Sequence, residues 1–275
     1  MIRNLLKWAG GKSQLLSEIV PRLPSGFVTY YEPFMGGGAL FFHLARAGLI
    51  RNAFLSDVNW DLITLYKAVQ DDPEGVDRQI STLEFNNNRL DYYRARSLFN
   101  ELPESESTRR AALMLYLNRH CFNGLHRYNS TGKFNVPFGN YRNPSMPGRE
   151  ELLEFAGLLR KAVLEVSDFQ EILGRARKGD FVYMDPPYVP LSKTSAFTSY
   201  TMNGFSLEDQ SRLARVAREL DSRGARFMIS HSATHIVKDL FSGFNLHEVK
   251  ARRAINSIGT GRGAIAELII TNYDA

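Results

Sequence analysis

Short runs of apolar residues recur along the 275-residue chain, each bounded by polar or turn-forming residues. Runs of this length that are rich in β-branched and aromatic side chains are typical of buried strands. The sequence predicts strands over Phe27–Glu32, Ala53–Asp57, Ala162–Val166, Phe181–Asp185, Ala225–Ser230 and Ala266–Thr271.

Segments with helical spacing of apolar residues separate these runs. Ser206 precedes the last of them, and Asp209 follows three residues later, which is the pattern of a helix capping box. Strands that alternate with helices favour an α/β fold, in which a mostly parallel sheet carries helices on both faces. The predicted helices cover Ala39–Ala47, Trp60–Val69, Glu150–Lys161 and Leu207–Asp221.

The alternation is interrupted between residues 61 and 147. This stretch shows mainly helical patterns and ends in a polar segment rich in Asn, Gly, Arg and Tyr, where Ser130–Lys133 has the composition of a hairpin turn. We therefore expect residues 61–147 to form a mainly helical insertion with a β-hairpin. The expected sheet domain comprises residues 1–60 and 148–275.

Composition narrows the class of protein. With 44% hydrophobic and 23% charged residues, the chain is globular rather than disordered. The single cysteine, Cys121, excludes an internal disulfide and a Cys-rich zinc site. No run approaches the roughly 18 apolar residues of a membrane span, and the N-terminal residues lack the apolar core of a signal peptide. We expect a soluble, cytoplasmic protein with no membrane partner.

A glycine-rich turn, Pro33-Phe34-Met35-Gly36-Gly37-Gly38, lies between a predicted strand and a predicted helix. Glycines there let the backbone approach a ligand that a Cβ atom would exclude. Asp57 ends the next strand, 57 − 37 = 20 residues after Gly37. Nucleotide-binding sheets place an acid for ribose hydroxyls at that spacing. The pattern favours a nucleoside ligand over a tight turn without one.

Lys7-Trp8-Ala9-Gly10-Gly11-Lys12-Ser13 is similar to part of a phosphate-binding P-loop, but Leu6 stands where that motif requires its first glycine. We therefore exclude an NTPase. Lys12 on this bend can still reach a carboxylate, and Trp8 offers an aromatic face to a base or a cation.

Asp185-Pro186-Pro187-Tyr188 follows a predicted strand, where open α/β sheets bind ligands. The two prolines remove N–H donors, so the backbone carbonyls and the Asp185 carboxylate form a site with acceptors only. Such a site suits an amine, and Tyr188 can stack on a planar ring. The alternative is a strand end without chemistry.

The net charge of +5 fits a phosphate-rich partner, and its distribution says more. Basic residues between Arg119 and Tyr128 are interleaved with aromatic and amide side chains, which suits contacts to bases. Arg252 and Arg253 form a second basic group, for which phosphate contacts and ordinary solvation are both open.

The combination of these motifs, in this order, resembles the Dam-type (alpha-group) DNA adenine-N6 methyltransferases that use S-adenosylmethionine (AdoMet). The resemblance runs from Leu6 to beyond Arg253 and includes the 118–129 and 134–139 segments. It implies a Rossmann-like, mostly parallel methyltransferase sheet with an inserted target-recognition domain. The chain departs from the family's pattern in small ways, including at His126.

The resemblance also implies roles for individual residues. The target adenine would be held by the catalytic residues Asp185, Pro186, Pro187 and Tyr188. The cofactor would be bound by Trp8, Lys12, Pro33, Phe34, Gly36, Gly37, Gly38, Asp57 and Asp185, with Asp57 on the ribose. Double-stranded DNA would be contacted by Lys7, Asn123, Leu125, Arg127, Asn129, Pro137 and Tyr141, joined by Arg252 and Arg253.

The expected reaction is methyl transfer from AdoMet to adenine N6 of a base flipped out of duplex DNA, with GATC as the recognition sequence. No metal is expected. Methylation at cytosine C5 is disfavoured because it needs a cysteine nucleophile, and Cys121 lacks that setting. The open alternatives are N4-cytosine or RNA methylation, and a catalytically silent AdoMet- or DNA-binding module.

Overall fold

The computed structural model describes residues 4–8, 10–187, 205–252 and 264–275, without the side chains of 251, 252, 264 and 265. Its central feature is a seven-stranded sheet with the order β3-β2-β1-β4-β5-β7-β6. The strands are β1 (Tyr30–Glu32), β2 (Ala53–Asp57), β3 (Ala162–Val166), β4 (Phe181–Met184), β5 (Arg226–Ser232), β6 (Asn245–Arg252) and β7 (Ala264–Thr271).

The prediction of a mostly parallel sheet is confirmed. Strands β3, β2, β1, β4 and β5 pair in parallel, whereas β7 pairs antiparallel with both β5 and β6. The described helices are α1 (Leu16–Ile19), α2 (Ala39–Arg46), α3 (Trp60–Asp71), α4 (Pro73–Ser81), α5 (Arg89–Glu101), α6 (Ser107–His120), α7 (Arg149–Leu159), α8 (Leu207–Ser222) and α9 (His235–Leu240), with short 3₁₀ turns between some of them.

Helices cover both faces of the sheet because its strand residues alternate between two apolar clusters. Phe181 and Tyr183 of β4 belong to the cluster that includes α2 and α7, whereas Val182 and Met184 belong to the cluster that includes α8. The capping box predicted for α8 is present: Ser206 Oγ accepts from the Asp209 N–H, and the Asp209 carboxylate accepts from the Ser206 N–H. The expected α/β class is confirmed.

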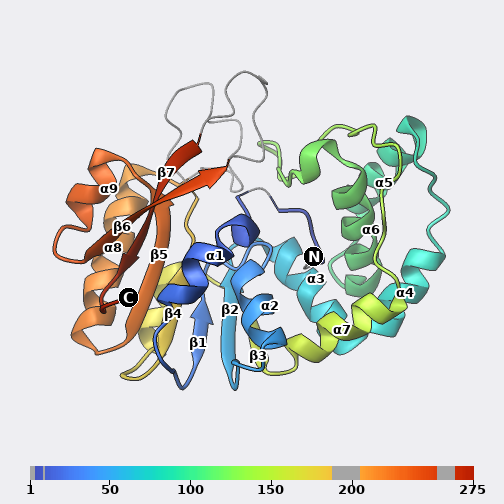
Figure 1. Ribbon diagram of the computed structural model, residues 1–275. Coiled ribbons are helices and arrows are strands. Elements are labelled where there is room, and N and C mark those ends of the chain that lie inside the picture. The colour runs from blue at the N-terminus through green and yellow to red at the C-terminus, as the bar shows by residue number, and fades with distance from the viewer. Residues whose placement is uncertain (1–3, 9, 188–204, 253–263) are drawn as a thin grey trace.

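The helices between β2 and β3 lie at one end of the sheet. Figure 1 shows α4, α5 and α6 gathered beyond β3, at the end opposite α8 and α9. Helix α3 packs against α6 and also against β3, and the cluster that covers one sheet face continues into α5 and α6. The sheet domain and the helical insertion therefore share an apolar core. Their division at residues 60/61 and 147/148 stays a prediction.

Several element ends differ from the predictions. Strand β1 begins at Tyr30 rather than Phe27, because Val28 and Thr29 donate their N–H groups to the 179–180 turn instead of to a strand. The predicted strands did not include β6, whose polar sequence pairs only with β7. The 130–133 turn is present, but the hairpin it closes is a single bridge between Tyr128 and Phe134.

Strand order reverses between β1 and β4. The chain runs from β1 outward to β2 and β3, then returns to β4 on the other side of β1. Open α/β sheets bind ligands at such a reversal, outside the carboxyl ends of the strands. The glycine-rich turn follows β1 and Asp185 follows β4, so both leave the sheet at this point. Among the described residues no helix has the length and apolarity to cross a membrane.

Candidate functional site

The glycine-rich turn packs directly beneath the indole ring of Trp8. Gly36 and Gly38 have positive φ angles of 46° and 61°. A Cβ atom on Gly36 would lie 2.9 Å from two atoms of the indole, and one on Gly37 would lie 3.0 Å from the Trp8 Cβ. The Tyr66 hydroxyl donates to the Gly36 carbonyl from below at 3.1 Å. Glycine is thus required both for the turn and for the close approach of Trp8.

Asp57 ties the end of β2 to the same turn. Its carboxylate accepts from the Gly36 N–H at 3.0 Å and from the Asn59 N–H at 2.9 Å. Burial raises the pKa of Asp57, and the backbone N–H groups partly oppose that effect. A carboxylate has about four lone-pair sites, so Asp57 keeps acceptor capacity for a ligand above the turn.

Lys12 and Asp185 form a largely buried ion pair. Lys12 Nζ lies 2.6 Å from Asp185 Oδ1, and it also donates to the Gly10 carbonyl at 2.9 Å. Burial raises the pKa of Asp185 to about 6, although the Lys12 ammonium opposes the shift. Pro186, the next residue, is buried. The pair brings the N-terminal segment to the carboxyl end of β4, as the sequence suggested for a lysine on that bend.

A third carboxyl group, Glu32, was not singled out from the sequence. It ends β1, lies 2% exposed, and accepts from the Tyr30 hydroxyl at 2.7 Å. Burial and the negative charges of Asp185 and Asp57 raise its pKa to about 8. Its position immediately before the glycine-rich turn was the available signal. The acids that end β1 and β2 and follow β4 thus surround the same space.

Pro33 and Phe34 lie on the other side of the turn. Pro33 is buried, and the Phe34 ring packs against Phe169 and Phe205 with centroid distances of 5.2 and 5.9 Å. Phe34 therefore joins the apolar cluster beneath α8. Its packing positions the turn, and a direct contact with a cofactor stays a prediction.

The structure brings three of the predicted DNA-contacting residues together. Lys7 Nζ lies over the Tyr141 ring, 4.3 Å from its centroid, and the Tyr141 hydroxyl accepts from the Asn123 N–H at 2.8 Å. Burial and the nearby Arg119 lower the pKa of Lys7. Asn118 fixes the Lys7 backbone, since its amide group bonds both the N–H and the carbonyl, at 2.8 and 2.7 Å.

The remaining residues of this segment have different surroundings. Arg127 Nε donates to Asn135 Oδ1 at 2.8 Å. Asn129 shapes the hairpin turn, because its Oδ1 accepts from the Thr131 and Lys133 N–H groups. Leu125 packs half-buried against the core, whereas Pro137 is exposed. The 118–141 segment therefore combines a fixed frame with exposed side chains at the same end of the molecule as Lys7.

Comparison with known proteins places this site in a family. Residues 8–255 match the D12 class N6 adenine-specific DNA methyltransferases. This chain belongs to that family. The expected Dam-type resemblance and the expected enzyme class are thereby confirmed.

Individual relatives match over nearly their whole length. A DNA adenine methylase from Serratia marcescens is 43% identical over 97% of both chains. Type II methyltransferase M1.LlaDCHI from Lactococcus lactis subsp. cremoris is 40% identical over 99% of this chain and 96% of its own. Type II methyltransferase M.MjaIII from Methanocaldococcus jannaschii is 40% identical over 99% of both.

Some predicted site residues of this methyltransferase lie outside the described residues. Tyr188 and Arg253 do so entirely, and for Arg252 the structure describes the strand β6 but not the side chain. Cys121 is buried within the 118–141 segment, and burial raises the pKa of its thiol to about 12. A thiol with that pKa is a poor nucleophile at neutral pH, which agrees with an enzyme that modifies an amine.

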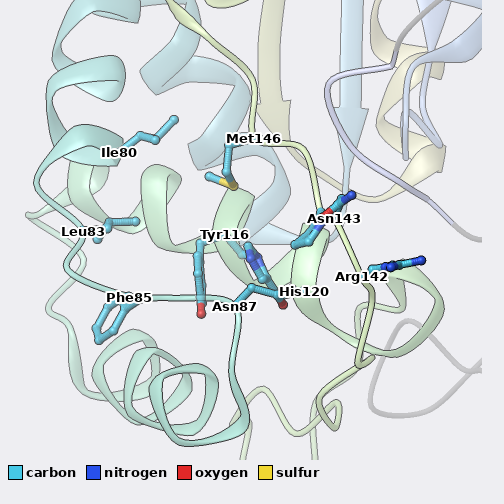
Figure 2. A pocket seen from close by; sticks show the side chains of 10 residues that line it. Ile80, Leu83, Phe85, Asn87, Tyr116, His120, Arg142, Asn143 and Met146 are labelled. Carbon is cyan, nitrogen blue, oxygen red and sulfur yellow. The ribbon is translucent and has the colours of Figure 1, made fainter.

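A cavity of about 320 Å³ lies elsewhere, within the helical part of the methyltransferase (Figure 2). Ile80, Leu83 and Phe85 form one side of it, and Tyr116 and His120 of α6 face them. It shares no residue with the group around the glycine-rich turn. The cavity is therefore not the place where Lys12 and Asp185 act.

Replacing Gly36 with Ala should displace the Trp8 indole, because the new Cβ has no room. Gly48→Ala is the matched control, since Gly48 also has a positive φ, of 72°, but nothing lies within 4 Å of a Cβ there. Left-handed backbone strain should cost both variants ~1–2 kcal/mol. In a Trp60→Phe background Trp8 is the only indole, and its emission maximum should shift in Gly36→Ala alone. Equal spectra would contradict the packing.

Proposed function

We propose that this methyltransferase transfers the methyl group of AdoMet to N6 of an adenine flipped out of duplex DNA, within the sequence GATC. The observation that carries the proposal is the Lys12–Asp185 ion pair beside the glycine-rich turn, at the strand-order reversal of the sheet. This arrangement offers a cofactor cradle and an acceptor for an amine within one site.

The charge of the cradle suits AdoMet. Trp8 packs against Gly36 and Gly37 and fixes the shape of the turn, and Asp57 keeps acceptor capacity for ribose hydroxyls. Burial raises the pKa values of Glu32, Asp57 and Asp185, and Lys12 partly compensates the charge of Asp185. A ligand with ammonium and sulfonium groups supplies further positive charge. When bound, AdoMet provides the electrophilic methyl group.

Asp185 has the chemistry to activate the amine. The lone pair of adenine N6 is delocalised into the ring, so the amine is a weak nucleophile. Acceptance of its N–H bonds by the Asp185 carboxylate and the Pro186 carbonyl favours a pyramidal nitrogen and returns the lone pair to it. The burial of Pro186 keeps water from competing for these bonds. Positioning and electrostatics then supply the rate.

A base within a duplex does not reach a site at the edge of a sheet, so the nucleotide must leave the stack. In this proposal Tyr188 stacks on the flipped base. Arg127 and Leu125 read bases, Asn123, Asn129, Pro137 and Tyr141 hold the recognition segment against the DNA, and Lys7 reaches the same site. Arg252 and Arg253 contact phosphates. The meeting of Lys7, Tyr141 and Asn123 supports this assignment.

Replacing Asp185 with Ala should reduce methyl transfer by several orders of magnitude, because the acceptor for N6 is removed. The loss also leaves Lys12 buried without its carboxylate, so Asp185→Asn, which keeps an acceptor for Lys12, is the second variant. Transfer of labelled methyl from AdoMet to duplex DNA, followed by nucleoside analysis, measures the effect. Near-normal turnover in folded variants would refute the mechanism. If the wild type produces labelled N4-methylcytosine, labels RNA or transfers no methyl group, the proposed reaction is refuted.

The pH dependence should report Asp185. Its pKa of about 6 means that the carboxylate, the accepting form, is lost as the pH falls through that value. The kcat/KM for AdoMet, which reports groups of the free enzyme, should therefore rise with pH, with the midpoint of the rise near 6. Lys12→Met removes the ammonium that holds this pKa down, so the rise should move to higher pH. An unmoved profile would show that another group controls it.

Replacing Arg127 with Ala should relax discrimination at one guanine of the site without changing AdoMet affinity. A guanidinium can bond guanine O6 and N7 together, worth about 1–3 kcal/mol of discrimination, and the Asn135 bond uses only one of its five donors. Arg252→Ala, the control, should weaken binding to all sequences and lower its salt dependence. Methylated positions on a random-site DNA library decide the matter. Identical preferences for wild type and Arg127→Ala would refute base reading, and a wild-type site other than GATC would refute the specificity.

A further inference from the structure

Trp8 contacts both halves of the proposed reaction site. One side of the indole lies against Gly36 and Gly37 of the cofactor turn. His126, in the recognition segment, stacks on the indole with a centroid distance of 5.4 Å and an interplanar angle of 27°. A single side chain thus separates the place proposed for AdoMet from the segment proposed to read DNA.

His126 continues this contact into a chain of hydrogen bonds. Its ring is 3% exposed, and its Nε2 lies 2.6 Å from the Tyr128 hydroxyl. That hydroxyl donates to Asp61 Oδ2, and Arg110 of α6 donates to Asp61 Oδ1. Because the only hydroxyl proton goes to the carboxylate, the ring must donate from Nε2. Burial lowers the pKa of His126 to about 4, so the neutral tautomer persists at neutral pH.

The chain of hydrogen bonds leads back to the glycine-rich turn. The Tyr128 hydroxyl also lies 3.4 Å from Oδ1 of Asn59, the N-cap of α3, and the Asn59 N–H donates to Asp57 Oδ1. Asp57 in turn holds the Gly36 N–H. The contacts from Gly36 through Trp8 and His126 to Tyr128 therefore return to Gly36 through Asn59 and Asp57, and they form a closed ring.

We infer that His126 and Tyr128 are positioning residues that couple occupancy of the cofactor cradle to DNA binding by the recognition segment. The inference rests on the proposed function. A cofactor bound at the glycine-rich turn restricts the movement of Trp8. Trp8 in turn holds the imidazole ring of His126, and with it the Leu125–Tyr128 stretch. By linkage the effect is reciprocal, so DNA must strengthen cofactor binding by the same factor.

The test is a binding cycle with S-adenosylhomocysteine, which carries no methyl group to transfer. The dissociation constant for a duplex containing GATC is measured by fluorescence anisotropy without S-adenosylhomocysteine and at its saturating concentration. Their ratio is the coupling factor. We expect a factor of about ten in the wild type, within the usual range for coupled sites.

Three variants test the hydrogen bonds in the closed ring of contacts. Tyr128→Phe removes only the hydroxyl, and His126→Phe keeps a stacking ring but removes the Nε2 bond. Both should reduce the coupling factor to near one, with each ligand alone bound nearly as in the wild type. Tyr116→Phe is the matched control, because it removes a hydroxyl bond from α6 to the Asn86 carbonyl, outside the ring. Its coupling factor should equal that of the wild type.

Each other outcome overturns the inference. A wild-type factor near one means that the sites are independent. A variant that binds DNA more weakly by the same ratio with and without S-adenosylhomocysteine has only a structural defect. A reduced factor in Tyr116→Phe shows that any hydroxyl loss has this effect. A wild type that binds no S-adenosylhomocysteine or no DNA refutes the proposed function itself, which is a distinguishable result.

Discussion

The site depends on how three carboxyl groups are held at the carboxyl edge of the sheet. Glu32, Asp57 and Asp185 come from β1, β2 and the end of β4, and Lys12 is the cation whose bond to Asp185 the structure shows. Breaking such a buried pair by removing one partner costs about 3–5 kcal/mol, although replacing both partners by apolar residues is often neutral. Stability alone therefore does not explain the pair. The proposed reaction, which needs an ionised acceptor, gives the pair a role beyond stability.

Features carried by neighbouring residues were predictable from the sequence, and features that arise only in space were not. The glycine-rich turn and Asp185 were found because contiguous motifs follow strands, and the sheet's parallel character followed from alternation. The stacking of Trp8 on His126 and the bond from Tyr128 to Asp61 join residues 118 and 67 positions apart, without a local signal. Strand β6 lacks an apolar run because it lies at the sheet edge.

A shared apolar core joins the sheet to the helices that lie between β2 and β3 in the chain. Helix α3 packs against β3 on one side and α6 on the other, so no water-filled gap needs to separate the two parts. Apolar packing resists continuous deformation. The turn after β1 and the helical part are therefore supported by one continuous packed core.

The hydrogen bonds that hold residues 4–7 in place have a consequence for the order of folding. Asn118 bonds the backbone of Lys7, and Arg119 donates to the carbonyls of Asn4 and Leu5, across separations of 111 to 115 residues. Asp185, the partner of Lys12, is synthesised later still. During synthesis, residues 4–12 are thus made long before the residues that become their final neighbours. Until α6 has been synthesised, the bonds from Asn118 and Arg119 to residues 4–7 cannot form. The Lys12–Asp185 pair forms only after β4 has been synthesised.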